Sequence, residues 1–334
     1  MKKSPARAVA ALFATAALAL AGCSANGTEP AAPGGNGADA DNEYTIGITQ
    51  IVSHPSLDAA REGFKETLEA SGLNVTFDEN NAQGDQGTAT SIASKFSTGD
   101  FDLVLAIATP TAQASAQVVT NKPILFTAVT DPVAAQLVDS NEAPGGNVTG
   151  TTDMNPVADQ IALVKKLKPE ATTVGVLYSS GEVNSEVQVN LAKEAAAAEG
   201  LELVERTITN TGEVAQGAAA LDVDAIYVPT DNNVVAGLAA VVQAAEQKQI
   251  PLIVGEGDSV REGGVITIGI DYRELGAQTG EMAVRILQDG ADPATMPVED
   301  QKEYTTYVNP EAAERMGVEI PEDLMAGATN VNNS

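Results

Sequence analysis

The chain has 334 residues and a formal net charge of −28 at pH 7, from 46 acidic and 18 basic side chains. A protein this acidic does not attract nucleic acid or anionic lipid through its general field. It has no tryptophan, which disfavours a sugar site built on stacked indoles, and one histidine and one cysteine, which exclude an ordinary zinc site.

The first 22 residues have the layout of a secretory signal peptide. Basic residues among the first seven precede an apolar run over residues 9–20, which is too short to span a membrane comfortably. Small residues then lead into Cys23, and the Leu-Ala-Gly-Cys ending resembles the lipobox of bacterial lipoproteins. We therefore expect lipidation of Cys23 and a lipid-anchored protein on the extracellular face of the cell membrane. The alternative is a plain signal peptide followed by an unpaired cysteine.

The next segment, within residues 23–42, is dominated by Gly, Ala, Pro, Asn and Asp and predicts a flexible tether. The roughly 290 residues that follow are too many for one ordinary domain and suit two lobes.

From residue 43 onward, strand and helix patterns alternate. In the first half we expect strands over residues 44–51, 73–77, 103–107 and 124–129, and helices over 57–70, 85–97 and 109–120. In the second half we expect strands over residues 173–178, 201–206, 225–228 and 251–254, and helices over 156–167, 182–199, 212–220, 232–248 and 275–289. Near-continuous Val, Ile and Leu strands between helices indicate parallel sheets covered on both faces. The expected fold class is therefore α/β, with two Rossmann-like lobes.

The repeat of this pattern gives an expected division of the chain. Lobe 1 is expected over residues 43–150 plus about 272–305, lobe 2 over 151–271 plus about 306–320, and a C-terminal tail over 321–334. The chain would cross between the lobes near residues 150–155, 270–272 and 304–309, and the helix over 275–289 would return to the first lobe.

Polar residues follow the strands of both halves. In parallel sheets, ligands bind beyond the carboxyl ends of the strands, where helix N-termini point their free N–H groups. The candidate ligand-binding residues at these ends are Gln50, His54, Thr109, Thr111, Thr130 and Asp131 in the first half, and Glu182, Asn184, Ser185, Thr230, Asp231, Asn232 and Glu256 in the second. Ser, Thr, Asp and Asn are also the favoured helix N-caps and Pro favours the first turn, so one such segment alone indicates little. Together they favour a cleft for a small zwitterion.

The charges of these segments predict how the zwitterion is held. They contain no Lys or Arg, so hydroxyls and helix N-termini would bind its carboxylate. Its ammonium needs a carboxylate, for which Asp231 is the first choice and Glu182 or Glu256 the next.

Catalysis has little support in the sequence. The only histidine is His54, and there is no Gly-x-Ser-x-Gly elbow, no Gly-Lys pair of a P-loop and no Gly-x-Gly-x-x-Gly after a strand. Paired carboxylates such as Glu256 and Asp258 could in principle perform acid–base chemistry. We expect no catalytic residues, no cofactor and no metal, and keep a secreted carboxylate-dependent enzyme as the less favoured alternative.

Motifs along most of the chain resemble one family. They are IGITQIVxHPxLD at 46–58, NAQGD at 81–85, AIATPxAQ at 106–113, FTAVTDPV at 126–133, PGGNVTG at 144–150, VGVLY at 174–178, SGExNS at 180–185, AIYVPTDN at 225–232, GEGD at 255–258 and GIDY at 269–272. They resemble the substrate-binding lipoproteins of ABC importers that are similar to tryptophan/phenylalanine binding proteins.

The resemblance implies a type I periplasmic-binding-protein fold that closes on a ligand between its two lobes. It also implies a small-molecule ligand, here an amino acid and by resemblance an aromatic one, and an ABC permease and ATPase as partners. We expect a monomer that binds no nucleic acid. A ligand sensor for a signalling receptor remains an alternative, because it needs the same hinge.

Overall fold

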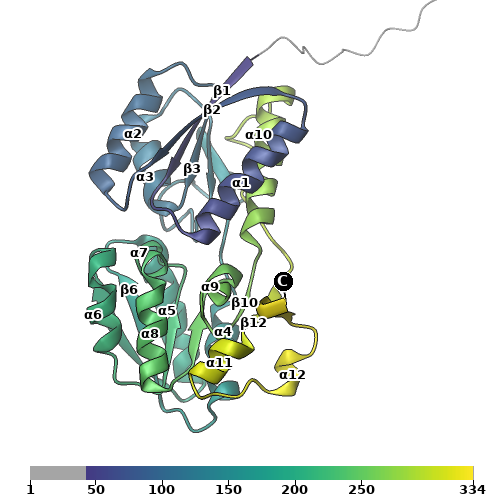
Figure 1. Ribbon diagram of the computed structural model, residues 1–334. Coiled ribbons are helices and arrows are strands. Elements are labelled where there is room, and N and C mark those ends of the chain that lie inside the picture. The colour runs from purple at the N-terminus through teal and green to yellow at the C-terminus, as the bar shows by residue number, and fades with distance from the viewer. Residues whose placement is uncertain (1–42, 334) are drawn as a thin grey trace, which may run out of the picture. The chain divides into compact units, whose positions relative to one another are not determined.

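The computed structural model describes residues 43–333, which form two sheets with helices on their faces (Figure 1). The expected signal peptide, Cys23 and the tether lie outside these residues. Within 43–333, no helix has the length and apolar character needed to cross a membrane.

The first sheet is entirely parallel, with the strand order β11-β5-β4-β3-β1-β2. Its strands are β1 (Glu43–Gln50), β2 (Asn74–Asn81), β3 (Leu103–Ile107), β4 (Ile124–Thr127), β5 (Val148–Thr152) and β11 (Glu299–Asp300). The helices packed on it are α1 (Pro55–Ala70), α2 (Gln86–Thr98), α3 (Thr109–Val118) and α10 (Tyr272–Asp289). Strands β3 and β4 are buried at every residue, which explains their unbroken apolar sequences.

Helix α10 comes from late in the chain yet packs along α1 of the first sheet (Figure 1). Two glycines allow this close approach. A Cβ atom on Gly276 would lie 1.8 Å from the carbonyl oxygen of Ala60, and one on Gly63 would lie 2.0 Å from that of Arg273. Any larger side chain at either position would push the two helices apart.

The second sheet has the strand order β13-β12-β10-β9-β8-β6-β7. It is parallel except that β12 runs antiparallel to β10. Its strands are β6 (Thr173–Ser179), β7 (Glu202–Ile208), β8 (Ala225–Val228), β9 (Leu252–Val254), β10 (Ile266–Gly269), β12 (Thr305–Val308) and β13 (Thr329–Asn330). The helices of this half are α4 (Val157–Leu167), α5 (Val183–Ala198), η1 (Thr211–Glu213), α6 (Val214–Ala219), α7 (Asn232–Ala236), α8 (Leu238–Lys248), α9 (Gly257–Arg261), α11 (Pro310–Arg315), α12 (Glu322–Met325) and η2 (Val331–Asn333).

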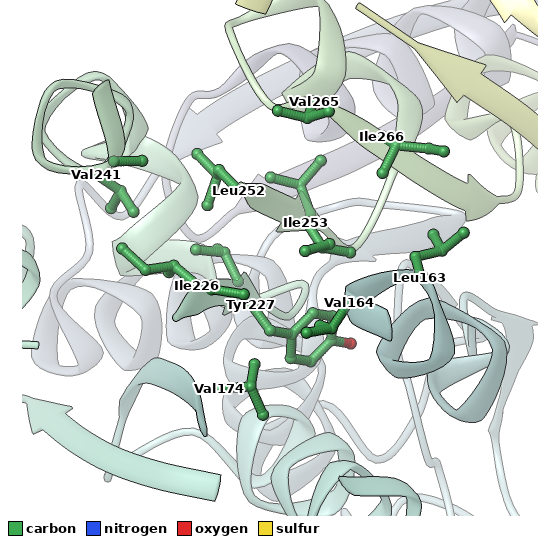
Figure 2. Close-up of a cluster of buried hydrophobic side chains, with 14 of the residues drawn as sticks. Leu163, Val164, Val174, Ile226, Tyr227, Val241, Leu252, Ile253, Val265 and Ile266 are labelled. Atoms are coloured by element: carbon green, nitrogen blue, oxygen red, sulfur yellow. The ribbon is translucent and has the colours of Figure 1, made fainter. Parts of the chain in front are cut away.

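Each sheet has its own hydrophobic core. Figure 2 shows part of the second core, where Tyr227 of β8 lies among branched aliphatic side chains that include Val164 and Val174. The Tyr227 hydroxyl is satisfied there because it donates to Gln160 Oε1 at 2.8 Å. Gln160 Nε2 in turn donates to the carbonyl oxygens of Gly255 and Ile268, which fixes the ends of β9 and β10 relative to α4.

The α/β class with two parallel-sheet lobes is confirmed. The strands predicted over residues 103–107 and 225–228 have exactly those bounds because both are fully buried apolar runs. The helix predicted over residues 232–248 is wrong in one respect: it is two helices, α7 and α8, that meet at Gly237. Residues 321–334, where we expected a tail, include α12 and β13, and β13 extends the second sheet.

Candidate functional site

A cavity lies where the strands of both sheets end. Its lining residues follow β1, β4 and β5 of the first sheet and β6, β8, β9 and β10 of the second. They are His54, Ser56, Leu57, Ala128, Asp153, Asn184, Thr230, Asn232, Val235, Glu256 and Tyr272. This is the position where open parallel sheets bind their ligands.

The N-terminus of α1 forms one wall of the cavity. His54 is its N-cap, but the histidine side chain makes no capping hydrogen bond within residues 43–333, and Pro55 has no N–H. The N–H groups of Ser56 and Leu57, in the first turn, have no acceptor inside the helix. The buried atoms His54 Nδ1 and Ser56 Oγ also have no hydrogen-bond partner in the described part of the chain. This wall therefore offers donors, and the helix dipole favours an anion there.

Glu256 faces this wall from the second sheet. It is 1% exposed and caps α9, with Oε2 accepting from Asp258 N at 2.6 Å and Oε1 from Ser259 N at 2.9 Å. Burial raises the pKa of Glu256 to about 7; the charge of the neighbouring Asp258 adds to this shift, and the Ser259 hydroxyl opposes it. Glu256 and Ser56 line the same cavity, so this carboxylate shares it with the N-terminus of α1.

Asp153 is the second carboxylate of the cavity. It follows β5 directly, at the start of the connection from the first sheet to α4. Its Oδ2 accepts from the Tyr272 hydroxyl at 2.5 Å and its Oδ1 from Thr130 Oγ1 at 2.9 Å. Burial raises the pKa of Asp153 despite these hydrogen bonds.

The cavity as a whole favours a positively charged group. Its lining, taken over the described chain, holds two carboxylates and no Lys or Arg. Burial lowers the pKa of His54 to about 4, so its imidazole is neutral at pH 7. A cation entering this cavity therefore meets two carboxyl groups and no Lys or Arg, beside one helix N-terminus that can hold an anion.

Some of the predicted ligand-binding residues line the cavity and others stand behind it. The lining members are His54, Asn184, Thr230, Asn232 and Glu256. Two more predicted residues lie behind the lining and hydrogen-bond to lining residues. Thr130 donates to the cavity residue Asp153, and Glu182 accepts from the amides of Asn184 and Asn232.

Asp231, our first choice for the ligand's ammonium, does not line the cavity. It is fully buried and caps α7, accepting from Val234 N at 2.9 Å. Its other oxygen accepts from Ser179 N and from the hydroxyl of Ser185, each at 2.6 Å. These donors satisfy the carboxylate inside the second lobe, so it is not free to meet a ligand. Ser185 is occupied by the same contact.

The remaining predicted residues make local contacts in the first lobe. Gln50 Nε2 donates to Asp58 Oδ1 at 2.8 Å, Thr111 Oγ1 bonds back to the carbonyl of Ile107 at 2.6 Å, and Asp131 accepts from Ala134 N at 2.9 Å. Thr109 Oγ1 is buried and has no partner within the described residues, but Thr109 is not among the cavity residues.

Sequence reasoning missed six lining residues: Ser56, Leu57, Ala128, Asp153, Val235 and Tyr272. Asp153 and Tyr272 carried a usable signal because both fall in segments predicted to cross between lobes. Ala128 carried none. Its φ of 57°, like the 79° of Ala108 after β3, is left-handed and unfavourable for a residue with a side chain. Such strain is visible only in the folded backbone.

Side-chain amides join the connections between the two sheets. Asn155 Oδ1 accepts from Ile270 N at 3.2 Å. Gln301 Oε1 accepts from Asp271 N at 3.2 Å, and its Nε2 donates to Asp271 O at 2.6 Å. The three connections therefore run next to one another, close to Asp153 and Tyr272.

Comparisons with known proteins agree with this geometry. The chain matches the family described as ABC transporter substrate binding protein over residues 45–332. It is 42% identical over 296 residues to a tyrosine-binding protein of Clostridioides difficile, covering 87% of this chain and 86% of that one. An ABC domain from Streptococcus pneumonia in complex with L-Trp is 36% identical with a TM-score of 0.83, covering 86% of this chain and 99% of that one.

A third relative was solved in a different state. It is the ligand-free, open structure of a substrate-binding protein with adhesive properties from Clostridium difficile, 43% identical with a TM-score of 0.65, covering 86% of this chain and 98% of that one. This open structure shares more sequence identity with the chain than the L-Trp complex does, yet its TM-score is lower. Motion of two lobes about a hinge produces this kind of difference.

Proposed function

Because the chain belongs to the ABC transporter substrate-binding protein family, we propose that it captures an aromatic amino acid for an ABC importer. Members of this family are solute-binding proteins rather than enzymes, and they work in the extracellular or periplasmic space with a permease and an ATPase. One observation carries the choice of ligand class: unpaired donors at the N-terminus of α1 and the buried carboxylate of Glu256 line the same cavity.

An α-amino acid carries its carboxylate and its ammonium on the same carbon. A site for this head group must therefore place donors and acceptors side by side. In our proposal, the N–H groups of Ser56 and Leu57 and the Ser56 hydroxyl hold the carboxylate. Glu256 and Asp153 take the ammonium, which removes the cost of leaving these buried carboxylates without a counter-charge.

The rest of the lining suits an apolar ring. Leu57, Ala128, Val235 and the ring of Tyr272 provide apolar surface between the polar groups. The two relatives with a named ligand support an aromatic side chain, because one is a tyrosine-binding protein and the other was solved with L-Trp.

The direct test is calorimetry of the purified protein with each of the twenty amino acids. Aromatic L-amino acids should bind, and anionic amino acids such as glutamate should not, because the lining already holds two carboxylates. Preferred binding of phosphate esters or dianions, or chemical turnover of the ligand, would overturn the proposal.

We further propose that the protein is held at the cell surface by lipid on Cys23, as the Leu-Ala-Gly-Cys sequence indicates. Two acyl chains are enough for stable anchoring. Cys23→Ala should move the protein from the membrane fraction into the soluble fraction. A variant that remains fully with the membrane would contradict lipid attachment at this residue.

A further inference from the structure

One buried polar atom of the cavity is not used by the head-group site. Asn184 is 3% exposed, and its Oδ1 has no hydrogen-bond partner within residues 43–333. Its Nδ2 donates to Glu182 Oε2 at 3.0 Å and to the carbonyl oxygen of Thr230 at 3.2 Å. A carbonyl oxygen can only accept, so the amide cannot turn round without losing this bond. Asn184 therefore presents an acceptor that needs a donor.

Glu182 holds this arrangement from behind. It is buried, and its Oε2 accepts from Asn184 Nδ2, from Asn232 N and from Asn232 Nδ2. Its Oε1 accepts from Asn233 Nδ2 at 2.9 Å. Glu182 is not a lining residue, so it acts as a positioning residue for the amides that are.

The order of the strands places Asn184 away from the head-group site. Glu256 follows β9, Thr230 follows β8 and Asn184 follows β6, and these strands are consecutive neighbours in the sheet. Two strand spacings separate the first residue from the last, roughly 10 Å. This is comparable to the span of an extended aromatic amino acid from its ammonium to the far edge of its ring.

We infer that Asn184 Oδ1 accepts a hydrogen bond from the far end of the ligand's side chain, so that the ligand is an aromatic amino acid with a phenol O–H or an indole N–H. This inference rests on the proposed function, because the head group must bind at Ser56 and Glu256. With phenylalanine in the site, Asn184 Oδ1 stays buried without a donor, and an unsatisfied buried acceptor lowers affinity.

The test is calorimetry of the wild-type protein with tyrosine, phenylalanine and O-methyltyrosine. Tyrosine should bind roughly 10- to 100-fold more tightly than phenylalanine. O-methyltyrosine keeps the oxygen but cannot donate, so it should lose the advantage as well. Equal binding of tyrosine and phenylalanine would overturn the role of Asn184 and leave the proposed function intact. Failure of every aromatic amino acid to bind would overturn both.

Asn184→Leu sharpens the test because leucine has a similar size and no acceptor. It should weaken tyrosine binding and, because the unsatisfied acceptor is gone, tighten phenylalanine binding, so that the preference for tyrosine disappears. General damage to the fold would weaken both. Asn190→Leu, at an exposed site of the same helix, is the control and should keep the preference. An Asn184→Leu protein that still prefers tyrosine would refute the inference.

Glu182→Gln tests the positioning role. Glutamine brings a donor to a place where four donors converge, so the preference for tyrosine over phenylalanine should shrink. Glu186→Gln, exposed on the same helix, is the matched control. An unchanged ratio in a folded Glu182→Gln protein would remove Glu182 from the mechanism.

Discussion

The two sheets bring opposite chemistry to the cavity. On the side of the first sheet, His54 Nδ1 and Ser56 Oγ are buried without partners in the described chain, and a helix N-terminus points into the space. On the side of the second sheet, carboxylates and amides hydrogen-bond to one another. Among residues 151–271, Asn184 Oδ1 is the one buried side-chain nitrogen or oxygen without a hydrogen-bond partner. Apart from the carboxylate of Asp153, which follows β5, the first edge thus presents donors to the cavity, and the second presents acceptors.

The contrast also divides the acidic residues of the second lobe. Asp231 and Glu256 both follow strands and both cap short helices. Asp231 is enclosed by donors from two other elements, whereas Glu256 lines the cavity. Substituting these two residues should therefore have different effects, one on stability and one on affinity.

The largest effect on binding is expected for Glu256→Gln, which removes the charge opposite the ligand's ammonium. Losing one partner of a buried ion pair costs about 3–5 kcal/mol, which is more than a hundredfold in affinity. Calorimetry with tyrosine measures this loss. Glu262→Gln, at an exposed site just after α9, should bind normally. Wild-type affinity in the Glu256→Gln protein would show that the ammonium binds elsewhere.

Asp231→Asn should act mainly on stability. The amide keeps one acceptor oxygen but turns its NH₂ group toward donors now bonded to the carboxylate, at a cost of about 1–3 kcal/mol. Chemical denaturation should show a lower free energy of unfolding, and ligand affinity should change less than threefold. A hundredfold loss of affinity with unchanged stability would return Asp231 to the ligand site.

Binding should depend on pH through Glu256, whose pKa burial raises to about 7. Below that pH the free protein holds a proton on this group, and the ligand's ammonium favours the ionised form. Affinity should therefore fall by up to about tenfold per pH unit below 7, with release of up to about one proton per ligand. Calorimetry at pH 6 in buffers of different ionisation enthalpy measures that proton, and at pH 8 the release should nearly vanish. Proton uptake at pH 6 would contradict the assignment.

Stability of the ligand-free protein is a less direct readout of the same group. Because the folded-state pKa of Glu256 is raised above 4.5, its contribution to stability falls as pH rises from about 4.5 to 7. His54 acts in the opposite direction, since its pKa is lowered from 6.5 to about 4 and its contribution is lost as pH falls below 6.5. The two contributions overlap, so the proton count on binding separates them better than a thermal midpoint.

The smallest effect is expected on the donor side, for Ser56→Ala. It removes one hydroxyl but leaves the N–H groups at the start of α1, so affinity should fall about 2- to 10-fold, from one neutral hydrogen bond. Ser53→Ala, in the loop before α1, is the control, because its hydroxyl bonds to Asp58. If Ser56→Ala lowers affinity as much as Glu256→Gln does, the donor side and the carboxylate side contribute equally to binding, which contradicts the expected order of effects.

The sequence alone determined the alternation of buried strands and helices. It predicted β3 and β8 to the residue, because short, fully apolar runs between turn signals are typical of buried strands. It also pointed to Asn184 and Glu256, which line the cavity, since polar residues after parallel strands collect at one edge of a sheet; their contact with a ligand stays a prediction. These predictions depend only on residues that are neighbours in the sequence, so a single stretch of chain is enough to make them.

Only the tertiary structure decided which polar residue lines the cavity and which is enclosed within the fold. In sequence, Asp231 and Glu256 are both acids after a strand, and nothing local shows that Ser179 and Ser185 enclose the first of them. Asp153 and Tyr272 reach the cavity because connections distant in the chain lie next to one another there. The hydrogen-bond partners of a buried group come from other elements, and therefore only the assembled lobes reveal which groups remain free.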